Sequence, residues 1–146
     1  MITSRSLSGT AAVSIILMSL AGCASFNPTP IEEVGFKDRA QTQTRNGITV
    51  SVAVLSAEEA KAAFDTKLYK KKIQPIWVEI TNDTNQLHGF LPRSIDPNYH
   101  SALEVAQKSH RLWSKKSNQA KREFYYRKQM PFELPPGETR SGFVFG

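Results

Sequence analysis

The histidines of this chain and the acidic residues near them are the first candidates for chemistry. His100 and Glu104 are four residues apart, a spacing that would place two metal ligands on one face of a helix. Neither His88 nor His110 supplies a second pair of ligands in the sequence. We therefore expect no metal site and no cofactor, and we expect His110 to be a packed helix residue.

Ser94, Asp96 and His100 include the residue types that a hydrolase uses. A serine nucleophile needs a base beside it and is often held in a strained turn between glycines. No glycine flanks Ser94, and Asp96 precedes Pro97, a pair that is typical of a turn. We therefore expect no catalytic residue in this chain.

A dense basic tract lies between residues 108 and 128. It contains eight Lys and Arg residues against Glu123 alone, whereas the whole chain of 146 residues has a net charge of +6. The eight are Lys108, Arg111, Lys115, Lys116, Lys121, Arg122, Arg127 and Lys128. A surface of this charge attracts any polyanion without reading its sequence. The alternative is a solvated helical face without a partner.

The N-terminal residues have the profile of a signal peptide. One positive charge, Arg5, precedes an apolar run at residues 9–20, GTAAVSIILMSL. The run is too short to span a bilayer as a helix. It ends at residues 20–23, LAGC, which contain the only cysteine of the chain.

Residues 20–23 resemble the lipobox of bacterial lipoproteins, which reads Leu, two small residues and Cys. The resemblance implies that the leader, residues 1–22, is cut before Cys23, that its thiol receives a diacylglyceryl group and that the new amino terminus is acylated. Each buried CH₂ contributes about 0.8 kcal/mol, so several acyl chains anchor a protein stably. The alternative is an ordinary leader that is cleaved at another bond.

This resemblance implies a location in the bacterial cell envelope. Ala24 follows the cysteine where the inner-membrane retention signal has Asp, so it resembles outer-membrane sorting, with the protein facing the periplasm. The expected partners are the bilayer, through acylated Cys23, and an anionic lipid or envelope polymer at the basic tract. Nucleic acid is not expected there, although Trp113, Phe124, Tyr125 and Tyr126 would stack on bases in a nucleic-acid-binding protein.

The rest of the chain is long enough for one domain. Removal of residues 1–22 from 146 leaves 124 residues, enough for one modest core. Residues 23–33 contain Pro28 and Pro30 and are expected to form an extended tether. Residues 34–146 are expected to form a single domain, because the next apolar positions begin there.

Strand signals dominate the first half of this domain. Residues 39–44 and 48–54 flank Asn46 and Gly47, the strongest short hairpin signal. Residues 48–54 and 74–81 alternate apolar and polar side chains, which predicts strands with one buried face. Residues 86–91 are expected to pair with 74–81, and 140–145 (RSGFVF) form a further strand.

Helices are predicted at two capping boxes. Ser56 with Glu59 and Ser101 with Glu104 each have the spacing of such a box. Residues 118–129 read as another helix, or as a strand from Phe124. Together these elements predict a mainly β, α+β fold, a small antiparallel immunoglobulin-like sandwich with short helical insertions. Because the apolar strand at 140–145 is followed by one residue, we expect the domain to be incomplete at its C-terminus.

Three segments carry a wider resemblance: residues 73–84 (IQPIWVEITNDT), 91–105 (LPRSIDPNYHSALEV) and 135–145 (PPGETRSGFVF). They resemble the N-terminal half of uncharacterised bacterial envelope lipoproteins, whose longer members carry an LssY-like C-terminal domain. The resemblance implies no chemistry, but it implies further chain after Gly146. We interpret the protein as a non-catalytic binding or structural module. The alternative is the N-terminal part of a hydrolase-like envelope enzyme, with its catalytic region missing from this chain.

Overall fold

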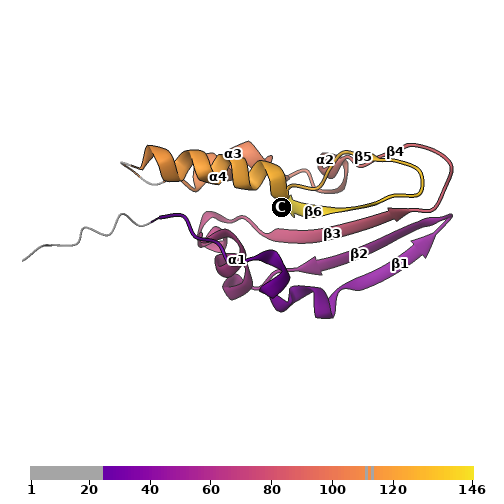
Figure 1. Cartoon of the computed structure of the whole chain (residues 1–146), viewed down its shortest axis with the longest axis horizontal. Helices are drawn as coiled ribbons and strands as arrows, with labels where there is room; N and C mark the ends of the chain where they lie inside the picture. Colours follow the sequence, from indigo (N-terminus) through magenta and orange to yellow (C-terminus); the bar gives the residue numbers. More distant parts are fainter. Residues whose placement is uncertain (1–24, 111, 113) are drawn as a thin grey trace, which may run out of the picture.

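A four-stranded antiparallel sheet forms the centre of the protein (Figure 1). The computed structural model describes residues 25–146 except residues 111 and 113. The central sheet consists of β1 (Gln41–Arg45), β2 (Ile48–Val54), β3 (Pro75–Asn82) and β6 (Thr139–Phe145), in the order β1-β2-β3-β6. A second sheet pairs β4 (His88–Gly89) with β5 (Glu133–Leu134).

Short helices complete the fold. The α-helices are α1 (Ala57–Phe64), α2 (Pro92–Ile95), α3 (Ala102–Lys108) and α4 (Lys115–Lys128), and the 3-10 helices are η1 (Ile31–Glu33), η2 (Gly35–Arg39) and η3 (Leu68–Lys71). In Figure 1, α1, α3 and α4 gather towards one end of the strands, and β4 and β5 lie towards the other end. The predicted α+β fold, β-rich and sandwich-like with antiparallel strands, is confirmed.

The hairpin between β1 and β2 forms as predicted. Asn46 and Gly47 both adopt positive φ, 51° and 75°, which a tight turn with the natural strand twist requires. The strands pair from Arg45 opposite Ile48 onwards. Local turn chemistry therefore sets the register of this half of the sheet.

The sheet buries side chains on both faces, which corrects the expectation of one buried face. On the face that carries Val78 and Ile80, the cover comes from residues near β5, such as Leu134. On the other face Trp77 is only 5% exposed, and its ring lies 5.9 Å from that of Phe36 in η2. The alternation itself was predicted correctly, but η2 and α1 cover the second face as well.

Phe64, at the end of α1, lies at the centre of the larger apolar cluster. Its ring is 4.9 Å from that of Phe143 and 5.5 Å from that of Phe145, both in β6. It stacks on Tyr125 of α4 with centroids 5.3 Å apart. This one residue therefore joins α1, α4 and the sheet.

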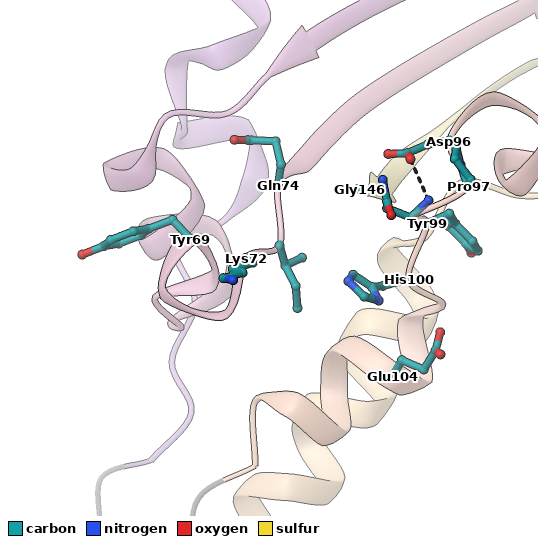
Figure 2. Close-up of a pocket in the computed structure, with 11 residues that line it drawn as sticks. Tyr69, Lys72, Gln74, Asp96, Pro97, Tyr99, His100, Glu104 and Gly146 are labelled. Carbon is teal, nitrogen blue, oxygen red and sulfur yellow. Dashed lines mark hydrogen bonds between the residues drawn. The ribbon is translucent and has the colours of Figure 1, made fainter.

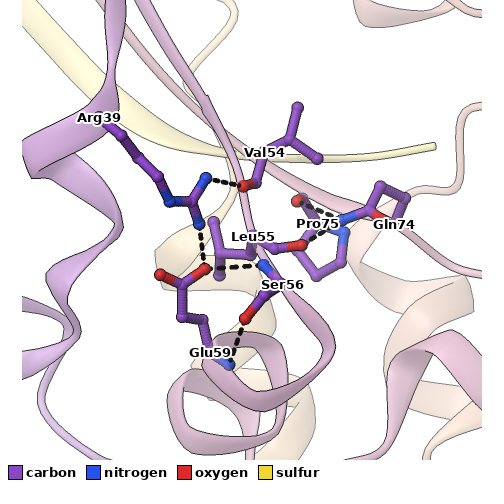
Figure 3. A network of polar contacts seen from close by, with 7 residues as sticks. All are labelled: Arg39, Val54, Leu55, Ser56, Glu59, Gln74 and Pro75. Carbon is purple, nitrogen blue, oxygen red and sulfur yellow. Dashed lines mark hydrogen bonds and ion pairs between the residues drawn. The ribbon is translucent and has the colours of Figure 1, made fainter.

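The junction between β2 and α1 is held by polar contacts (Figure 3). The predicted capping box is confirmed, since Ser56 Oγ accepts from the Glu59 amide and the Glu59 carboxylate accepts from the Ser56 amide. Arg39 pairs with Glu59 and also donates to the Val54 carbonyl at 2.6 Å. Gln74 donates to the Leu55 carbonyl at 2.8 Å. These bonds fix where α1 leaves the sheet.

Residues 86–91 do not pair with β3, which corrects the second predicted hairpin. The free edge of β3 is taken by β6, and β4 pairs with β5 instead. The Asn82 side chain, fully buried at the end of β3, donates to the carbonyls of Gln86 and Leu134, each at 2.8 Å. This side chain directs the chain away from β3 into the second sheet.

The packed region begins earlier than residue 34. The Phe26 ring contacts that of Phe124 in α4 at 5.3 Å, and the Thr29 amide donates to the Ala62 carbonyl at 2.9 Å. Ile31 and Val34 belong to the core. Residues 26–34 therefore lie on the domain, although residues 23–33 were expected to form a tether.

Candidate functional site

The basic tract of the sequence lies on two helices. Lys108 ends α3, and α4 carries Lys115, Lys116, Lys121, Arg122, Arg127 and Lys128. Arg111 and the predicted lipidation site Cys23 lie outside the described residues. The helix predicted at residues 118–129 is confirmed as α4, which begins earlier, at Lys115, and ends at Lys128, and its aromatic residues do not begin a strand.

Four of these cations lie on the outer side of α4. Lys115, Lys116, Arg122 and Arg127 are exposed, and their spacing places them within one half of the helix circumference. The Lys128 ammonium lies 5.9 Å from the Phe124 ring. These residues can form part of a surface that faces an anionic partner.

Lys121 lies inside the protein, which corrects its assignment to that surface. It is 1% exposed, and its ammonium donates to the Ser109 carbonyl at 2.8 Å. Ser117, Lys121 and Tyr125 are four residues apart and form the buried side of α4. The ammonium also lies 5.6 Å from the Phe26 ring.

Lys121 borders a cavity of about 320 Å³ between α4, α1 and the segment that leads into η3. Three exposed lysines, Lys61, Lys67 and Lys71, line the same cavity, together with His110. His110 is exposed, so it is not the packed helix residue that was predicted. We call this cavity the lysine pocket.

The lysine pocket has an excess of positive charge. Asp65 is its one acidic residue among the described residues, and its Oδ2 accepts from the Asn27 amide at 3.2 Å. Asp65, the residue directly after α1, has a left-handed conformation, φ 42°, which turns the chain towards the pocket lysines that follow. Four lysines and one acidic residue therefore line this cavity within the described part of the chain.

Thr66 also lines the lysine pocket. It is 8% exposed, and its hydroxyl has no hydrogen-bond partner within the part of the chain that the structure describes. The Tyr125 hydroxyl lies close to it and 3.4 Å from Ser109 Oγ. Burial raises the pKa of the Tyr125 phenol, and the hydroxyls of Ser109 and Thr66 act in the opposite direction.

A larger cavity of about 730 Å³ contains the residues that suggested metal or hydrolase chemistry (Figure 2). Asp96, His100 and Glu104 line it, whereas Ser94 does not and is exposed. The Lys108 ammonium lies 3.3 Å from the His100 ring. Within the described residues, no group of three His, Cys, Asp or Glu side chains is placed to hold a metal ion.

Both carboxylates of this larger cavity bind backbone amides. Asp96 Oδ1 accepts from the Asn98 amide at 2.8 Å, and Glu104 accepts from the Ser101 amide at 2.7 Å in the predicted capping box. The hydrogen bonds from Ser101 hold the pKa of Glu104 below its usual range. The pKa of Tyr99 is raised, first by burial and then by Glu104. The two carboxylates therefore hold the backbone near them, Asp96 in a turn and Glu104 at the start of α3.

The sequence showed the cations of α4 but not the lysine pocket. Lys71 is one of three consecutive lysines in the sequence, and only the packing of α1 against α4 brings it to the same cavity as Lys121. In the described residues, 25–146 without 111 and 113, no helix is long and apolar enough to cross a membrane. Comparison with protein-family models, curated proteins and solved structures found no match to this chain.

Proposed function

We propose that this protein is a lipid-anchored, non-catalytic module of the bacterial cell envelope that binds an anionic surface. Residues 1–22 are its signal peptide, acylated Cys23 is its anchor, and it faces the periplasm from the outer membrane. The lipobox-like residues 20–23 support the anchor. The exposed cations of α4 support the anionic partner, a lipid surface or an envelope polymer.

The packing of Phe26 on α4 is the observation that carries this proposal. The two rings, Phe26 and Phe124, are 5.3 Å apart. Three residues of extended chain span at most about 10 Å. A lipid on Cys23 would therefore hold α4, with the exposed cations of its outer side, close to the bilayer.

The acyl chains and the exposed cations of α4 would contribute differently to membrane binding. Acyl chains bind any bilayer, whereas each Lys or Arg near an anionic surface contributes about 1 kcal/mol and makes the contact sensitive to salt. Lys115, Lys116, Arg122 and Arg127 are the cations available for it. Together they would orient the domain on the surface to which the lipid holds it.

Vesicle binding tests the electrostatic half of the proposal. A leaderless form, residues 24–146, is expected to bind vesicles rich in phosphatidylglycerol and to dissociate from them at high salt. It is not expected to bind phosphatidylcholine vesicles. Charge reversal at Lys115, Lys116, Arg122 and Arg127 should remove the binding. If the unaltered leaderless form shows no salt-dependent binding to anionic vesicles or envelope polymers, the basic surface has no such partner.

A further inference from the structure

We propose that the lysine pocket binds a phosphate group, carried by a lipid headgroup or by free phosphate. The pocket is distinct from the outer surface of α4, because three of its four lysines come from other elements and the fourth, Lys121, lies on the buried side of the helix. Lys61 lies on α1, Lys67 precedes η3 and Lys71 ends it, and Lys121 reaches the pocket from the buried side of α4.

Charge is the first argument for this ligand. Four lysines and His110 line the cavity, against Asp65 as the single acidic residue of its lining among the described residues. An ammonium acts as a compact point charge and donates hydrogen bonds to phosphate oxygens without a planar geometry. Charges of one sign around a hollow concentrate the field within it and attract an anion.

The buried lysine is the second argument. Lys121 is 1% exposed, and its ammonium donates to the Ser109 carbonyl at 2.8 Å. This hydrogen bond fixes the position of one positive charge beside a cavity whose other three lysines are exposed.

Size and position restrict the ligand further. A cavity of about 320 Å³ is at the small end of ligand sites, which suits a phosphate with a small substituent. Lys121 lies 5.6 Å from the ring of Phe26, three residues after the proposed anchor. A lipid headgroup is therefore a source within reach, although the pocket does not depend on the anchor for its charge.

Calorimetric titration of the full chain in neutral detergent tests the site. The two probes are inorganic phosphate and a water-soluble, short-chain phosphatidic acid, at constant ionic strength. Lys61→Gln, Lys67→Gln and Lys71→Gln combined alter only exposed residues of the pocket. The matched control combines Lys115→Gln, Lys116→Gln and Arg122→Gln, which removes three charges from the outer side of α4.

We expect saturable binding that the pocket variant weakens about tenfold or more and the control variant less than about threefold. Phosphatidic acid that binds more tightly than inorganic phosphate identifies a lipid headgroup, and equal affinities identify free phosphate. Absence of saturable binding of both probes up to about 10 mM, or equal losses in the two variants, overturns the proposal. Neither result bears on the vesicle test, which depends on α4.

Discussion

Two buried hydroxyls, those of Tyr125 and Thr66, show how single residues link the core to the lysine pocket. The pKa of Tyr125 is raised by burial. The native protein therefore keeps this proton at a pH at which the unfolded chain has lost it. This phenol does not change the stability below about pH 10, and above that value it lowers the stability by at most about 1.4 kcal/mol per pH unit.

We predict that Tyr125→Phe reduces the loss of stability between about pH 9 and pH 11. Tyr126 is the matched control, since it is the next residue of α4 and is exposed. Tyr126→Phe should leave the pH dependence close to that of the unaltered protein. Urea unfolding at both pH values measures the difference. The same alkaline loss in Tyr125→Phe and in the unaltered protein would show that this phenol does not titrate as inferred.

Thr66 and Thr84 form a second matched pair. The Thr66 hydroxyl lacks a hydrogen-bond partner among the described residues, whereas Thr84 Oγ1 donates to Asn82 Oδ1 at 2.7 Å. Thr66→Val should leave the free energy of unfolding unchanged or raise it by up to about 1 kcal/mol, and Thr84→Val should lower it by about 1 kcal/mol. Urea unfolding without phosphate checks both values. A greater loss for Thr66→Val than for Thr84→Val would contradict this reading.

At the scale of elements, the segment after α4 crosses close to β6. The Met130 amide donates to the Phe143 carbonyl at 2.9 Å, and a Cβ on Gly142 would lie 2.6 Å from backbone atoms of Gln129 and Met130. Backbone atoms cannot yield as the tip of a side chain can. The crossing therefore depends on glycine at this position.

Gly142→Ala should destabilise the protein by about 2 kcal/mol or more, because overpacking forces the backbone to shift. Gly89→Ala is the control, since a Cβ there meets no atom within 4 Å. It should change stability by less than about 0.5 kcal/mol. Thermal unfolding of the two variants measures the contrast. Equal stabilities would mean that the chain does not cross β6 as described.

The elements that were predicted correctly depend on neighbours in sequence. Asn46 and Gly47 determine their own turn, and the serines of both capping boxes bind a glutamate three residues later. The pairing of β4 depends on Glu133 and Leu134, far along the chain, and the side chain of Asn82 also binds the Leu134 carbonyl. Local patterns cannot show which strand occupies the edge of β3.

The site was harder to predict than the fold for a similar reason. A lysine in a helix is normally predicted to be exposed, yet Lys121 shares the buried side of α4 with Ser117 and Tyr125. The pocket requires residues 61–71 and 121 to meet, and this contact exists only after α1 packs against α4 through Phe64. The charge of the tract was visible in the sequence, but its division into a pocket and an outer surface was not.

At the scale of the whole molecule, three features lie near one another. Residues 26–29 pack on α1 and α4, the lysine pocket opens between the same helices, and exposed cations cover the outer side of α4. With one charge of the +6 in the leader at Arg5, the rest of the chain keeps a net charge of +5. The proposed anchor would bring this basic end to a membrane surface.

The mass of the mature N-terminal peptide, from protein expressed in a Gram-negative host and taken from its membranes, tests the central claim most directly. The account predicts a peptide that begins at Cys23 and carries a diacylglyceryl group on its thiol and an acyl group on its amino terminus. Cys23→Ser, the control, should remain uncleaved and unmodified. An unmodified Cys23, or cleavage at another bond, would contradict the account.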